Sequence, residues 1–162
     1  MAFKLLACTL CCCVILGCKT QQQTSTTVSI GSETFQLELA LDIPSRTEGL
    51  MHRTEIATTG GMLFVFPDAI KRSFWMKNCL ISIDLIFLDS RGTITALHAM
   101  PPEPEKASDE SNLEYEGRLN HYWSGPPARF AIELKSGSIQ RLHLKVNDRI
   151  ELDTAHLRSL AR

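Results

Sequence analysis

The sequence predicts an α+β domain dominated by antiparallel sheet, most simply a small closed or partly closed barrel with two short helices. Glycine and proline separate apolar segments of strand length, and two of these segments flank a hairpin turn. Only two short segments carry helix signals. With 162 residues, 44% of them apolar, the chain can form the core of one domain without disulfides. Its 17 basic and 18 acidic side chains give no electrostatic reason to expect nucleic acid as a partner.

The chain begins with the composition of a targeting signal. Lys4 is the only charged residue before Lys19, and residues 5–17 are small or apolar. Thirteen residues are too few for a membrane-spanning helix, which needs roughly 20, but they match the apolar part of a secretory signal. We therefore predict a signal peptide over residues 1–17. Five of the six cysteines fall in the first 18 residues, so no disulfide is expected in the mature chain.

The segment Ile15-Leu16-Gly17-Cys18 resembles the lipobox of bacterial lipoproteins. The resemblance implies that Cys18 is acylated and becomes the new N-terminus, and several acyl chains anchor a protein stably. Lys19 stands where an aspartate often marks retention in the inner membrane, which favours the outer membrane in a cell that has two. An ordinary signal peptide and a short buried helix with incidental cysteines are the alternatives.

A polar tether and then a strand follow the predicted anchor. Residues 18–27 contain almost no apolar side chain and are typical of a flexible spacer, so order is expected to begin near Val28. From Thr34 the chain alternates between apolar and other residues, as a strand with one buried face does. The predicted buried face comprises Phe35, Leu37, Leu39 and Leu41.

The first helix is predicted over residues 45–52. Asp42 and Ser45 are both suitable caps, and Ser45 with Glu48 forms an S-x-x-E capping box. The predicted buried residues of this helix are Leu50 and Met51.

Between residues 62 and 99, the sequence predicts four strands. Met62–Phe66 is an apolar run closed by Pro67, and a second strand is expected over Phe74–Asn78. Residues 84–88 and 93–99 form the arms of a hairpin, whose turn ends at a glycine suited to the left-handed conformation.

The last third begins with a long polar segment, residues 101–121, which is predicted to be a loop. A strand over residues 129–134 follows, and then a helical turn or two through Leu142. Residues 146–152 are predicted to be a closing strand, and residues 153–162 a C-terminal extension.

Five stretches, in this order, resemble the widespread prokaryotic domain of unknown function 192 over residues 28–152. They are Arg46-x-x-Gly49-Leu50-Met51-x-Arg53, Gly61–Phe66, Phe74-Trp75-Met76-Lys77-Asn78, Asp84–Phe87 and Ala128–Leu134, the last leading to Gly137 and Val146-Asn147-Asp148. Cys79 and Ser82 depart from the usual threonine and proline of the family, and Asn147-Asp148 replaces its Gly-Asp. The resemblance implies a small β-rich barrel and brings no agreed activity.

Six residues are candidates for a ligand site. A strand over residues 74–78 would place Trp75 and Lys77 on one face. An indole wall with nearby cations suits a small polar or carbohydrate-like ligand, or a partner protein of the envelope. The candidate set is Arg46, Arg53, Trp75, Lys77, Asn78 and Asp84.

Other functions remain as alternatives. Asp84 and Glu133 could form the carboxylate pair of an envelope glycan hydrolase, which requires two carboxyl groups in one cleft. The same charged residues could instead pair with one another and have a purely structural role. No cofactor or metal is expected, because the methionines lie in apolar runs and the histidines are scattered. Cys79, a lone thiol in an apolar segment, is expected to be an inert core residue.

Overall fold

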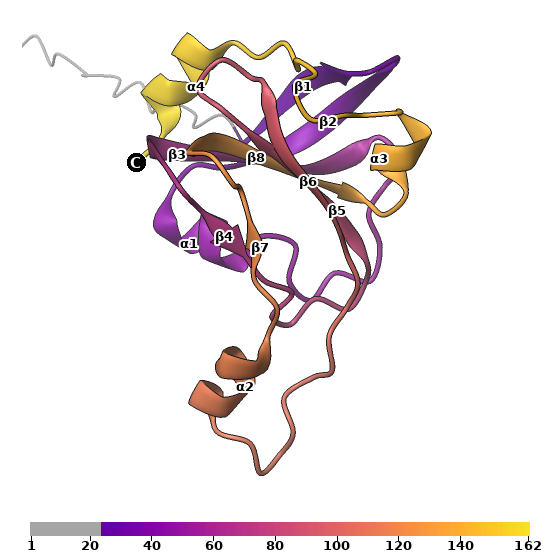
Figure 1. Ribbon diagram of the computed structural model, residues 1–162, viewed down its shortest axis with the longest axis vertical. Coiled ribbons are helices and arrows are strands. Elements are labelled where there is room, and N and C mark those ends of the chain that lie inside the picture. The colour runs from indigo at the N-terminus through magenta and orange to yellow at the C-terminus, as the bar shows by residue number, and fades with distance from the viewer. Residues whose placement is uncertain (1–23) are drawn as a thin grey trace, which may run out of the picture.

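The computed structural model describes residues 24–162, so the predicted signal peptide, Cys18 and most of the tether lie outside the described residues. A six-stranded sheet with the order β1-β2-β3-β8-β5-β6 forms the body of the domain (Figure 1). Its strands are β1 (Ser25–Ile30), β2 (Glu33–Ala40), β3 (Gly60–Ile70), β5 (Ile83–Leu88), β6 (Ile94–Met100) and β8 (Ala128–Lys135). Strands β4 (Ser73–Phe74) and β7 (Tyr122–Trp123) pair separately.

The predicted α+β class with mainly antiparallel pairing is confirmed. Only β2 and β3 run parallel, and the other four neighbouring pairs of the main sheet are antiparallel. The barrel is not confirmed, because the sheet order ends at β1 and β6 and is not closed within the described residues. Strand β1 starts at Ser25, so residues 25–27 of the predicted tether belong to the sheet.

Four short helices accompany the sheet within residues 24–162, instead of the two predicted. They are α1 (Ile43–Glu48), α2 (Asn112–Arg118), α3 (Ser138–Arg141) and α4 (Thr154–Leu160). Helix α1 begins after Asp42, which is its N-cap, while Ser45 is the reciprocal member of the capping box. The segment predicted as a loop contains α2, and the predicted C-terminal extension contains α4.

Two predicted strands differ from the structure. The strand over Phe74–Asn78 is wrong, because only Ser73–Phe74 pairs and the chain then turns, with Asn78 at φ 54°. Residues 146–152 meet the hairpin through the isolated bridge between Thr93 and Arg149 rather than as a strand. Asn147, at φ 78°, turns the backbone there.

Strand β3 also continues past Pro67, where the sequence predicts its end. Its pairing with β8 shifts register between Val65 and Ile70, and Pro67 lies within that shift. A proline lacks the amide hydrogen for a sheet ladder, so an irregularity of this kind is where a strand tolerates it.

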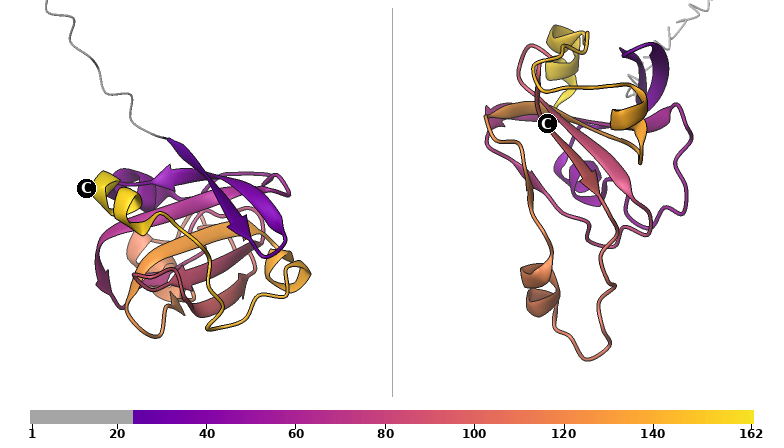
Figure 2. Two further views of the ribbon diagram at one scale, coloured as in Figure 1. Left: turned by 90° about the horizontal axis from the view of Figure 1, so that it is seen from above. Right: turned by 45° about the vertical axis from the view of Figure 1, so that its right-hand side comes forward.

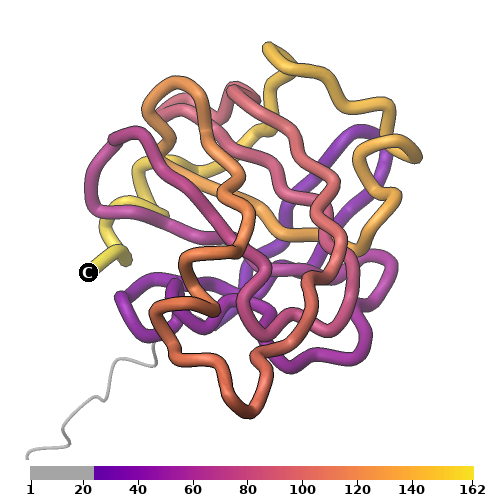
Figure 3. Tube along the Cα trace, turned by 60° about the horizontal axis from the view of Figure 1, so that its bottom comes forward, coloured from indigo at the N-terminus to yellow at the C-terminus, as the bar shows by residue number. Residues whose placement is uncertain are grey.

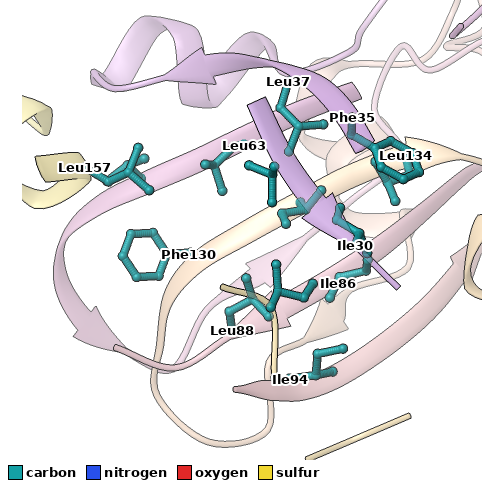
Figure 4. Packing of buried hydrophobic residues seen from close by; sticks show 14 of the residues in the cluster. Ile30, Phe35, Leu37, Leu63, Ile86, Leu88, Ile94, Phe130, Leu134 and Leu157 are labelled. Atoms are coloured by element: carbon teal, nitrogen blue, oxygen red, sulfur yellow. The ribbon is translucent and has the colours of Figure 1, made fainter. Parts of the chain in front are cut away.

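The sheet buries a hydrophobic cluster on each face. Leu63, Ile86 and Ile132 belong to the first cluster, to which α4 contributes Leu157 (Figure 4). Phe64, Leu85 and Ala131, their neighbours along the same strands, belong to the second cluster, to which α1 and β4 are adjacent. Alternate side chains of a strand point to opposite faces, which explains why the two clusters are interleaved in the sequence.

The connection between β6 and β7 carries α2 away from the sheet (Figure 2). It forms the lower end of the molecule in Figure 1 and is turned toward the reader in Figure 3. Side chains of α2 nevertheless reach back to the turn that follows β4, as described below.

Candidate functional site

A pocket of about 450 Å³ opens beside the second hydrophobic cluster. Helix α1 and the glycine turn after it form one side, and residues 71–75 form another. Strands β3 and β8 contribute Phe64, Phe66 and Glu133. This volume lies within the range of small-molecule sites in proteins.

Aromatic rings form the walls of the pocket. Phe74 packs edge-to-face against Phe64, with ring centroids 4.9 Å apart, and against Phe66, at 6.4 Å. Trp75 is partly buried beside the ring of His121, at a centroid distance of 5.9 Å. Rings held in this way present flat apolar surfaces to a guest.

Glu133 is the buried acid of the pocket. It lies on β8, opposite Met62 of β3 and Leu85 of β5, and is only 5% exposed. Its Oε2 atom has no hydrogen-bond partner among the described residues. Burial raises the pKa of this carboxyl group to about 8, although the Leu50 amide and the charge of Arg53 act in the opposite direction. At neutral pH the group is therefore mainly a neutral acid that can both donate and accept a hydrogen bond.

Cys79 also lines the pocket, as a buried free thiol. Burial, and secondarily the proximity of Glu133, raise the pKa of the thiol to about 12. A thiol with this pKa is almost wholly protonated at neutral pH and is a poor nucleophile. Its burial agrees with the core residue predicted from the sequence.

Cationic side chains gather at the Phe66 end of the pocket. The Arg72 guanidinium carbon lies 3.7 Å from the centroid of the Phe66 ring, and that of Arg46 lies 5.6 Å from it. Lys71 lines the pocket as well, with its ammonium nitrogen 5.2 Å from the Trp123 ring centroid.

Of the six candidates from the sequence, Arg46 and Trp75 line the pocket. Arg46 donates to the backbone oxygens of Leu41 at 2.6 Å, Val65 at 3.0 Å and Arg162 at 2.9 Å, so it also joins α1 to the sheet and the end of α4.

Arg53, Lys77 and Asn78 do not line the pocket. Arg53 forms a two-pronged ion pair with Glu38, with both N···O distances 2.7 Å. Lys77 pairs with Glu116 of α2, and its ammonium nitrogen lies 5.5 Å from the Trp75 ring centroid.

Asn78 connects three segments of the chain. Its backbone oxygen accepts from the backbone amide of His52 at 2.9 Å, and its backbone amide donates to the Tyr115 hydroxyl at 3.1 Å. These contacts are those of a structural turn, as the purely structural alternative expects.

Asp84 has a structural role. Its side chain is 2% exposed and accepts from the Ile139 amide at 2.7 Å, so it satisfies the first turn of α3. Asp84 stands opposite Leu134, one residue after Glu133, and successive side chains of a strand point to opposite faces. The two carboxylates therefore cannot share a cleft, and the geometry does not support the hydrolase alternative.

Sequence reasoning missed Lys71, Arg72 and the three phenylalanines as pocket residues, and considered Glu133 as a catalytic acid or a structural ion-pair partner but not as a ligand-binding residue. Glu133 did carry a signal, because it is the one acid inside the apolar run Ala128–Leu134. Arg72 carried none, since its hydrogen bond to the Ala128 oxygen joins segments far apart in the sequence.

The protein is an α+β domain with an open, mostly antiparallel sheet and an aromatic-walled pocket on one face. The chain belongs to the family of the domain of unknown function 192, described as an uncharacterised ACR family, whose sequence profile matches residues 25–152. Among curated proteins, no significant match is found.

Two crystal structures are similar to the chain. One, from Sinorhizobium meliloti 1021, is described as a candidate transcription regulator. It is 30% identical, with a TM-score of 0.62 over 77% of this chain and 89% of that one. The other, a protein of unknown function from Novosphingobium aromaticivorans DSM 12444, is 24% identical. Its TM-score is 0.59 over 79% of this chain and 84% of that one.

Proposed function

We propose that the protein is a non-catalytic binding module for a small ligand, held in the cell envelope by a lipid on Cys18. The pocket beside α1 is the binding site. The observation that carries this proposal is Glu133, a buried acid in an aromatic-walled pocket whose Oε2 lacks a partner within residues 24–162.

A purely structural role accounts poorly for Glu133. A polar group buried without a hydrogen bond destabilises a fold, and buried side-chain oxygens usually have partners. A ligand that donates to Oε2 would complete this site. The structural role does fit Asn78 and Asp84, whose contacts lie within the chain.

Binding is favoured over catalysis because the acid pair expected from the sequence, Asp84 and Glu133, is not brought together in the pocket. Asp84 faces the other side of the sheet, and the thiol of Cys79 is protonated at neutral pH. The description of the Sinorhizobium protein as a regulator adds no nucleic-acid surface here, since basic and acidic side chains nearly balance.

The envelope location is supported by the sequence of the first 18 residues, with its short apolar segment and Cys18. Among the residues that the structure describes, no helix has the length and apolar character needed to cross a membrane. A lipid anchor would therefore supply the attachment, with the outer membrane favoured by Lys19.

Thermal unfolding of the full chain in detergent, followed by tryptophan fluorescence, tests the proposed binding. A panel of small anions, cations and neutral sugars should contain compounds that raise the melting temperature, and Glu133→Gln should reduce the effect. Glu151→Gln, at an exposed acid outside the pocket, is the control and should respond like the wild type. No stabilisation by any charge class, together with a less stable Glu133→Leu variant, would leave Glu133 with a structural role only.

A further inference from the structure

The two ends of the pocket differ in their chemistry. Met62, Phe64 and Phe66 lie at alternate positions of β3 and belong to the same hydrophobic cluster. At about 3.3 Å per residue, Met62 and Phe66 are about 13 Å apart along the strand. Glu133 stands opposite Met62, whereas the two guanidinium groups lie against Phe66. A neutral acid and a cationic cluster thus occupy opposite ends of an aromatic floor.

The cationic end retains unused hydrogen-bonding capacity. Arg72 donates through Nε to the Ala128 oxygen at 3.3 Å and through Nη2 to Asp68, while its Nη1 has no partner among the described residues. Lys71 is exposed and forms no ion pair within residues 24–162. An arginine with a free donor edge and a lysine without an ion pair, both lining one pocket, suit a carboxylate or phosphate.

The acid end favours a neutral partner over a cationic one. The carboxyl group of Glu133 is mainly protonated at neutral pH, so it can donate to and accept from a hydroxyl without an opposite charge. The cations at the other end would also repel a ligand ammonium. Between the two ends, the rings of Phe64 and Phe74 favour a flat apolar body.

We propose that the pocket takes a small organic anion with a flat apolar body, which places its anionic group at Arg72 and Lys71 and a hydroxyl at Glu133. This inference rests on the proposed binding function and specifies the chemical class of the ligand. The pocket volume of about 450 Å³ suits a molecule with one ring and two short polar substituents.

Calorimetry on the full chain in detergent tests the ligand class with matched compounds. The probes are 4-hydroxyphenylacetate, phenylacetate without the hydroxyl, the neutral alcohol tyrosol and the cation tyramine, and the indole counterparts of the acid, alcohol and amine. In at least one ring series the acid should bind about tenfold more tightly than the alcohol or the amine. For the phenyl series, removal of the hydroxyl should weaken binding by a similar factor.

Variants assign each end of the ligand. Lys71→Gln combined with Arg72→Gln should remove the preference for the acid over the alcohol. Glu133→Gln should reduce the difference between 4-hydroxyphenylacetate and phenylacetate. Lys145→Gln, at an exposed lysine outside the pocket, is the control and should leave every ratio unchanged.

The outcomes separate this inference from the proposed function. Alcohols or amines that bind as tightly as the acids would overturn the anion class while the pocket remains a binding site. The same holds if the acids fail to bind and other members of the broader panel stabilise the protein. No binding by any compound would overturn both.

Discussion

At the scale of single residues, Glu133 and Asp84 show that buried carboxyl groups can have two different roles, one in a pocket and one in the fold. Both acids are buried on adjacent central strands. Asp84 is held by a backbone amide at 2.7 Å, whereas Glu133 retains an unpaired oxygen in a pocket. The sequence marks both as acids in apolar strands, but the partner of each depends on elements distant in the chain.

Glu133 should make the stability of the protein depend on pH. Burial raises the pKa of its carboxyl group from 4.5 to about 8, so between these values the folded state binds more protons than the unfolded state. The free energy of unfolding should therefore fall as pH rises from about 5 to 8, by up to about 1 kcal/mol per pH unit from this group. Urea unfolding of the wild type and Glu133→Gln at several pH values measures the difference.

The neighbours of Glu133 set the control for that experiment. Arg53 interacts with the carboxyl group through its charge, and the Cys79 thiol is protonated throughout this pH range. The fall in the free energy of unfolding between pH 5 and 8 that Glu133 contributes should persist in Cys79→Ser and be absent from Glu133→Gln. A constant difference between wild type and Glu133→Gln from pH 5 to 8 would contradict the raised pKa.

Asp84 should matter for folding and not for binding. Asp84→Ala removes the acceptor of the partly buried Ile139 amide and should lower the free energy of unfolding by about 1–3 kcal/mol. Asp84→Asn retains an acceptor and should lose less. Chemical denaturation measures the stability, and ligand affinity measured where each variant is folded should stay unchanged; a loss of affinity in Asp84→Asn would return Asp84 to the site.

At the scale of elements, the clearest patterns in the sequence predicted the structure best. Period-2 alternation identified β2, and the glycine turn identified the β5–β6 hairpin, in which Gly92 has φ 87°. Helix α2 was missed because its capping box, Ser111 with Glu114, lies in a polar segment with few apolar residues. The turn after Phe74 was missed because its contacts come from α2 and the chain after α1, far away in sequence.

Helix α2 should be attached mainly through Tyr115. This side chain is 2% exposed, and its hydroxyl accepts from the Asn78 amide at 3.1 Å, whereas Lys77 and Glu116 form a partly exposed ion pair. Tyr115→Phe should speed hydrogen exchange over residues 101–121, since a buried hydrogen bond contributes about 1 kcal/mol. Glu116→Gln should change exchange less, because such ion pairs contribute little. The reverse order would show that the ion pair holds α2.

At the scale of the whole molecule, the sheet separates a hydrophobic core on one face from the pocket on the other. Helix α4 packs on the face with the first cluster, and the face with the second cluster carries the pocket. Family membership was predictable from five short motifs in the chain, whereas the open sheet and the lining of the pocket depend on long-range pairing that no local pattern specifies.

Attachment to the envelope is a prediction for the entire chain. Growth with a labelled fatty acid should label the protein, and Cys18→Ala should abolish both the label and the membrane fraction. Cys8→Ala, which removes a cysteine of the predicted signal peptide, should keep both. Labelling that survives in Cys18→Ala would contradict the assigned acylation site.

The carboxyl carbon resonance of Glu133 in ¹³C NMR reports whether Glu133 is the buried polar end of a ligand pocket. The signal should titrate near pH 8 in the free protein and should move when a stabilising compound binds. A signal that titrates near pH 4.5, or that stays in place while a compound binds tightly, would contradict this role of Glu133.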